Sequence, residues 1–126
     1  MNKPFVVTTG EPAGIGPDIS LSIADRDDAS DFVVFANLNL LKERASVLDL
    51  ELSFIEYQPQ SQPIILEKNQ LLVQNFDLTK EVQCGELNEA NSPYVIEMIK
   101  QATKGCLIRD FSGLITGPVS KEVIAN

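Results

Sequence analysis

Short runs of apolar residues recur along the chain and predict β-strands. The first run contains Phe5-Val6-Val7, and the second is Phe32-Val33-Val34-Phe35-Ala36. Further runs at residues 52–57 and 113–116 have the same β-branched and aromatic character. Continuous apolar runs of this length are typical of parallel strands that are covered on both faces. The sequence therefore predicts four strands, and it indicates that the one at 113–116 is buried.

Apolar residues also recur at helical spacing between these runs. Pro17 suits the first position of a helix, and Asp18 suits its first turn near the positive end of the helix dipole. The apolar residues that follow are spread over a wide face, namely Ile19, Leu21, Ile23 and Ala24. The charged cluster at residues 25–28 closes this helix, and we interpret it as solvated surface rather than a metal site.

Two more helices are predicted from caps and apolar stripes. Asn37 suits the N-cap of a helix whose stripe is Leu38, Leu41, Ala45 and Leu48. Its polar side, predicted to face water, carries Lys42, Glu43 and Arg44. Ser92-Pro93 suits the start of a third helix, and Gly105 suits its C-cap. The stripe of this third helix contains Val95, Ile99 and Ala102, with Met98 beside it.

The alternation of strands and helices predicts an α/β fold with a doubly wound, parallel sheet. The middle of the chain departs from this alternation. Residues 58–63 form a polar loop rich in Gln and Pro, and the apolar runs at 64–66 and 71–73 predict a small two-stranded ribbon. No domain boundary is apparent within residues 1–126.

A glycine-rich turn at residues 10–17, with the sequence Gly-Glu-Pro-Ala-Gly-Ile-Gly-Pro, separates the first strand from the first helix. Such a turn lets the backbone approach a ligand closely and can place anionic groups at a helix N-terminus. The spacing does not fit the dinucleotide fingerprint or the P-loop. The sequence therefore predicts a ligand-binding loop of another kind.

A second turn at residues 115–121, with the sequence Ile-Thr-Gly-Pro-Val-Ser-Lys, repeats this arrangement after the last strand. Ligands of open α/β sheets bind beyond the carboxyl ends of the strands, so both turns could face one crevice. The alternative is that both are only tight connections between a strand and a helix. Their spacing alone does not decide between the two.

Charge and composition exclude several classes of function. The net charge of −8 and the pI near 4.4 disfavour nucleic acid and anionic membranes as partners. The chain has no histidine, which excludes Ser-His-Asp and Cys-His nucleophile systems and disfavours a zinc site, since its ligands would have to be two cysteines and carboxylates. Cys84 and Cys106 form no C-x-x-C pair and are expected to be reduced. Neither a signal peptide nor a membrane span is apparent, so a cytoplasmic location is expected.

The two glycine turns together resemble the PdxA family, the 4-hydroxythreonine-4-phosphate dehydrogenases of pyridoxal 5′-phosphate (vitamin B6) biosynthesis. The resemblance implies an α/β/α sandwich like that of isocitrate and isopropylmalate dehydrogenases, and a homodimer with its site between two domains. It also implies NAD-dependent oxidation and decarboxylation of 4-phosphooxy-L-threonine, a small phosphorylated hydroxy acid, to 3-amino-2-oxopropyl phosphate. A divalent metal (Zn, Mg or Co) would assist the reaction.

Family members are much longer, and their metal-ligating histidines and Gly-His-Thr segment lie downstream of the part matched here. We therefore expect residues 1–126 to be the N-terminal α/β portion of a two-domain enzyme, inactive alone. No catalytic residue or metal ligand is assigned in it, and its cofactor-binding residues are not identified. The candidates for lining the cleft are the residues that match the two turns: Gly10, Glu11, Gly14, Ile15, Gly16, Thr116, Gly117 and Lys121.

Three alternatives stay open at the level of sequence. The enzyme could oxidise another 4-phosphorylated sugar acid, such as threonate or erythronate 4-phosphate. The chain could instead be a non-catalytic module that binds a phosphorylated metabolite, as the absence of histidine favours. It could also be a folding remnant with an unpaired sheet edge that promotes association.

Overall fold

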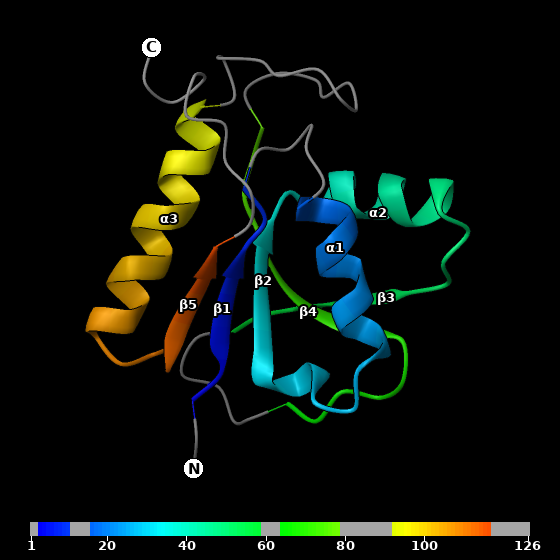
Figure 1. Cartoon of the computed structure of the whole chain (residues 1–126), viewed down its shortest axis with the longest axis horizontal. Coiled ribbons are helices and arrows are strands. Elements are labelled where there is room, and N and C mark those ends of the chain that lie inside the picture. Colours follow the sequence, from blue (N-terminus) through cyan, green and yellow to red (C-terminus); the bar gives the residue numbers. More distant parts are fainter. Residues whose placement is uncertain (1–2, 11–15, 59–63, 79–91, 117–126) are drawn as a thin grey trace.

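A five-stranded parallel sheet forms the centre of the computed structural model, which describes residues 3–10, 16–58, 64–78 and 92–116 (Figure 1). The order of the strands across the sheet is β3-β4-β2-β1-β5, and every neighbouring pair is parallel. The strands are β1 (Phe5–Thr8), β2 (Phe32–Ala36), β3 (Ser53–Glu56), β4 (Gln70–Asn75) and β5 (Gly113–Thr116).

Helices cover both faces of this sheet and give an α/β/α arrangement. Side chains alternate between the faces, because successive residues of a strand point to opposite sides. Val6, Phe35 and Leu72 pack in one cluster with α3 (Ser92–Leu107), and Val7 and Val34 pack in a second cluster with α1 and α2. In Figure 1, α3 lies on one side of the sheet, and α1 (Gly16–Leu21) and α2 (Leu38–Val47) lie on the other. The predicted fold class is confirmed.

The apolar runs identified strands correctly but did not reveal their positions in the sheet. The run at 32–36 forms β2, whose residues Val33 to Ala36 are at most 2% exposed. The run at 113–116 forms β5, which lies at an edge of the described sheet, so Ile115 is 45% exposed. The prediction that this strand is buried was wrong. An apolar run indicates that a strand can be buried. The position of the strand in the sheet decides whether it is covered by neighbouring elements.

The predicted two-stranded ribbon is also wrong. Residues 64–66 form no strand, and Leu71–Val73 lies inside β4, between β3 and β2. β3 and β4 are parallel although no helix is assigned in the described residues that connect them. The predicted ribbon paired the run at 71–73 with the run at 64–66, whereas the run at 71–73 forms an interior strand of the sheet.

The first two helices follow the predicted pattern with four differences. The Asn37 side chain caps α2 by accepting a hydrogen bond from the Leu40 N–H at 3.0 Å. Leu48 follows α2 as its exposed C-cap residue rather than completing the buried stripe. α1 is only six residues long, and Ile19 on it is 56% exposed. Short 3-10 turns continue the chain after α1, at Ser22–Asp25 and Ala29–Asp31.

The third helix continues past the predicted C-cap. Gly105 lies within α3, and a side chain added there would overlap the ring of Phe111. The helix ends instead with Arg109 in the left-handed conformation, at φ 65°. The Asp110 N–H donates to the Gly105 carbonyl at 2.8 Å, and the Arg109 N–H donates to the Cys106 carbonyl at 3.1 Å, which is the Schellman pattern. Close packing, rather than chain reversal, accounts for the glycine.

Candidate functional site

The two glycine turns begin at neighbouring positions on the carboxyl edge of the sheet. β1 and β5 pair in parallel with Thr8 opposite Thr116, so the two strands end at the same level. The order of the strands reverses here, because the chain passes from β1 to β2 on one side and later returns through α3 to β5 on the other. Open α/β sheets bind ligands outside such a reversal. This edge is therefore the candidate site.

Only part of the predicted cleft lining lies in the described residues. Gly10 is buried and has a φ of 75°, Gly16 is buried and begins α1, and Thr116 is an exposed residue at the end of β5. The remaining candidates lie outside the described residues: Glu11, Gly14, Ile15, Gly117 and Lys121. That the two turns line one crevice stays a prediction.

Thr8 ends β1 and Thr9 follows it, before Gly10, and neither was among the predicted site residues. Thr9 is fully buried, and its N–H and Oγ1 both donate to the Phe35 carbonyl, at 3.4 and 3.2 Å. Thr8 is also fully buried, and its Oγ1 has no hydrogen-bond partner among the described residues. Polar residues at the end of a buried strand were the available signal. The two bonds of Thr9 to β2 fix the direction in which the chain enters the turn. The next residue, Gly10, has a positive φ, which favours glycine over other residues by about 1–2 kcal/mol.

An ion pair fixes the other end of the first turn. Arg44 Nε and Nη2, on α2, donate to Asp18 Oδ1 and Oδ2, on α1, at 2.7 and 2.8 Å. The two side chains are only 19% and 30% exposed. The prediction that Arg44 faces water was therefore wrong. Helical spacing placed it on the polar side of α2, but the sequence does not reveal that α1 packs beside that side.

A second group of hydrogen bonds ties the carboxyl ends of β2 and β4 together. The Asn37 N–H donates to Tyr94 Oη at 2.8 Å, and Asn37 Nδ2 donates to the Phe76 carbonyl at 2.8 Å. The Leu38 N–H donates to Asn75 Oδ1 at 2.7 Å. These bonds join α2, α3 and the segment after β4. They connect the segments at the carboxyl ends of β2 and β4, and β2 lies next to β1 in the sheet.

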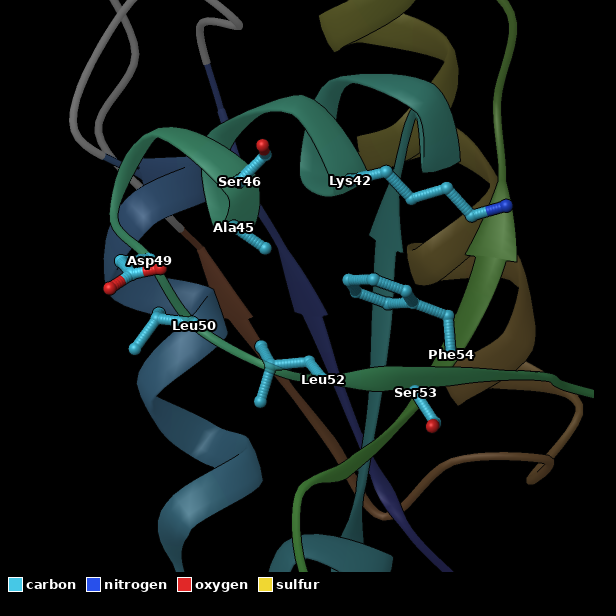
Figure 2. A pocket seen from close by; sticks show the side chains of 8 residues that line it. All are labelled: Lys42, Ala45, Ser46, Asp49, Leu50, Leu52, Ser53 and Phe54. Carbon is cyan, nitrogen blue, oxygen red and sulfur yellow. The ribbon is translucent and has the colours of Figure 1, made fainter.

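A hollow of about 630 Å³ lies away from this edge, between α2 and β3 (Figure 2). It is lined by Lys42, Ala45, Ser46, Asp49, Leu50, Leu52, Ser53 and Phe54. Figure 2 shows Ala45, Leu52 and Phe54 gathered between the helix and the strand, where Leu52 and Phe54 pack against the core cluster that includes Ala45. Two strands separate β3 from β1. The hollow is therefore no part of the candidate site.

The charged cluster at 25–28 is solvated, as predicted. Arg26 Nε pairs with Asp28 Oδ1 at 2.7 Å, and their side chains are 58% and 42% exposed. The hydrogen bond from Arg26 lowers the pKa of Asp28. Among the described residues, no three His, Cys, Asp or Glu side chains come close enough to hold a metal ion.

Two other titratable groups lie on the α3 side of the sheet. Burial, together with the charge of Asp110, raises the pKa of Tyr57, whose ring packs against Phe111 at a centroid distance of 5.6 Å. Cys106 is a free, half-buried thiol, and Cys84 lies outside the described residues, so that both are reduced stays a prediction. Within those residues, no helix has the length and apolar character needed to cross a membrane.

Comparisons with known proteins identify relatives of this chain. Residues 28–126 match the model of the family "Pyridoxal phosphate biosynthetic protein PdxA". A 4-hydroxythreonine-4-phosphate dehydrogenase of Serratia proteamaculans is 45% identical over 123 residues, which are 98% of this chain and 37% of the relative. The same enzyme of Vibrio parahaemolyticus is 40% identical over 120 residues, or 95% of this chain and 36% of the relative.

Solved structures share the fold of this chain. A crystal structure of a 4-hydroxythreonine-4-phosphate dehydrogenase from Klebsiella pneumoniae superposes with a TM-score of 0.86 at 20% identity. The match covers 98% of this chain and 39% of that one. At this identity the likeness concerns the fold alone. The chain spans less than two fifths of the length of the relatives it matches.

Proposed function

Because the chain belongs to the PdxA family, we propose that residues 1–126 act as the N-terminal α/β portion of a two-domain 4-hydroxythreonine-4-phosphate dehydrogenase. That enzyme oxidises 4-phosphooxy-L-threonine with NAD and releases carbon dioxide, forming 3-amino-2-oxopropyl phosphate for pyridoxal phosphate biosynthesis. The observation that carries the proposal is the identity of 40–45% to dehydrogenases of this name over nearly the whole chain. We also propose that the enzyme is a cytoplasmic homodimer.

In this proposal the glycine turns form one wall of the cleft. The positive φ of Gly10, the burial of Gly16 and the register of Thr8 with Thr116 support a role at the carboxyl edge of the sheet. The turn residues would bring backbone groups close to the substrate or to NAD. No acid–base role and no metal ligand is assigned to the residues of the two turns.

The donor set of this chain does not fit the divalent metal that the family resemblance implies. The chain contains no histidine, and the described residues bring no three metal-ligating side chains together. We therefore assign no metal ligand and no metal-dependent step to residues 1–126. Their proposed contribution is to position and enclose the ligand.

A kinetic assay tests the proposal. The protein encoded by the complete reading frame that contains these residues is incubated with NAD, a divalent metal and 4-phosphooxy-L-threonine, and NADH formation is followed. Threonate 4-phosphate and erythronate 4-phosphate are assayed in parallel, and residues 1–126 alone serve as the control. We expect turnover of the first substrate by the complete protein only. Preference for one of the sugar acids would support the alternative dehydrogenase, and turnover of none would contradict both.

One observation favours a second candidate, a non-catalytic module. The absence of histidine leaves residues 1–126 without the commonest acid–base group, so they could bind a phosphorylated metabolite without transforming it. Isothermal calorimetry of residues 1–126 with 4-phosphooxy-L-threonine distinguishes the two. Binding by this part together with inactivity of the complete protein would favour the module.

A further inference from the structure

Arg44 lies on α2 at its contact with α1, where its side chain can control the position of α1. α1 has only six residues, too few to form a stable helix without tertiary support. It begins at Gly16, the last glycine of the first turn, and Asp18 follows two residues later. The displacement of α1 relative to the sheet would therefore displace the end of that turn.

The contact between Arg44 and Asp18 restricts both the distance and the angle between the helices. A guanidinium that donates two parallel hydrogen bonds to one carboxylate fixes the orientation of both groups, which a single contact does not. The two bonds measure 2.7 and 2.8 Å and are shielded more than those of an exposed pair. Shielding from water strengthens the attraction between the charges.

The residue that provides this contact belongs to a firmly held helix. Leu41 of α2 is fully buried against the sheet, and Asn37 caps the start of the helix while bonding to the Phe76 carbonyl. Arg44 lies one turn beyond Leu41. A continuous series of contacts thus runs from the sheet through α2 and Arg44 to Asp18 and Gly16.

We propose that Arg44 is a positioning residue, which holds α1 and with it Gly16 in place beside the carboxyl edge of the sheet, where the proposed function puts the ligand. The proposal rests on the proposed function for its kinetic consequence. The pair joins two helices that are distant in sequence, since its members are 26 positions apart along the chain. Arg26 and Asp28 form an ion pair with similar bonds but are only two residues apart and well exposed, so they provide a matched control.

The kinetic test uses the protein from the complete reading frame with the variants Arg44→Met, Arg44→Lys and Asp18→Asn. We expect KM for NAD or for the phosphorylated substrate to rise about tenfold, because small displacements of positioning groups have effects of this size or larger. We expect kcat to stay within about twofold, since no reacting group is removed. Arg26→Met should change neither constant. The exchanged pair, Asp18→Arg with Arg44→Asp, should recover part of the lost affinity.

Hydrogen exchange tests the positioning separately from catalysis. Amides of residues 16–21 should exchange faster in Arg44→Met than in the unchanged protein. Amides of β4 should exchange at the same rate in both proteins. Arg26→Met should leave the exchange of residues 16–21 unchanged. If the unchanged protein has no turnover, the proposed function fails while exchange still tests the contact. Unchanged exchange in Arg44→Met, or an Arg44→Met enzyme with unchanged KM, would overturn the role of Arg44.

Discussion

At the scale of single residues, side chains far apart in the sequence give several positions their meaning. Gly105 resembles a helix cap in the sequence but makes room for Phe111, and Arg44 resembles a solvated cation but binds Asp18. Thr9 extends a strand in the sequence but anchors the first glycine turn to β2. In each case the residue type indicated that the position has a special role. The partner that decides this role lies too far away in the sequence for a local pattern to include it.

Gly105→Ala should destabilise the fold because the new methyl group would overlap the Phe111 ring within a packed cluster. Overpacking of this kind costs about 1–3 kcal/mol, which outweighs the gain in helix propensity of about 1 kcal/mol. Urea denaturation measures the free energy of unfolding. Lys104→Ala, at the neighbouring exposed position, is the control and should change it by less than about 0.5 kcal/mol. A Gly105→Ala protein more stable than the unchanged one would show that Phe111 moves without cost.

At the scale of elements, the sequence predicted most helices and strands but assigned the apolar run of β4 to a separate two-stranded ribbon. The central strands were recognisable because burial on both faces requires continuous apolar runs. The start of α2 was recognisable because Asn37 has a local capping role. β4 was mistaken because its apolar run is preceded by another at residues 64–66, and local pattern does not tell which of two runs joins the sheet.

Variants of Asn37 separate the capping of α2 from the bond that connects Asn37 to the segment after β4. Asn37→Asp keeps an oxygen that can accept the bond from the Leu40 N–H but loses the donor to the Phe76 carbonyl. Asn37→Ala loses both. Removal of an exposed side chain is the reference. We expect Asn37→Ala to lower the free energy of unfolding by about 1–3 kcal/mol more than this reference does. Asn37→Asp should lie between Asn37→Ala and the unchanged protein in urea denaturation. Equal stability of Asn37→Ala and the unchanged protein would contradict this account of the junction.

At the scale of the whole molecule, the arrangement of layers determines where a ligand can bind. α1 and α2 cover one face and α3 the other, so the reversal of strand order falls between β1 and β5. The Asn37 bonds connect the segments that follow β2 and β4 with α3. The glycine turns therefore start where an open α/β sheet binds its ligands.

The edge at β5 should promote association of residues 1–126 when they are isolated. Among the described strands β5 pairs only with β1, and the half-exposed Ile115 lies on it. Unpaired edges with apolar side chains pair with other chains, and a lysine on such an edge opposes this. Sedimentation velocity over a range of concentrations should show association, which Ile115→Lys reduces. Ile65→Lys, at an exposed apolar residue outside the strands, is the control. A monomer at all concentrations would contradict the prediction.

The sequence by itself determined the fold class, the cap of α2, the solvated cluster at 25–28 and the two glycine turns that resemble the PdxA family. These features depend on residue type and local spacing, which a linear chain records directly. The tertiary structure alone decided that β4 is central, that β5 lies at an edge, that Gly105 faces Phe111 and that Arg44 holds Asp18. Each of these depends on the strand order and on contacts between elements distant in sequence, so no local pattern records it.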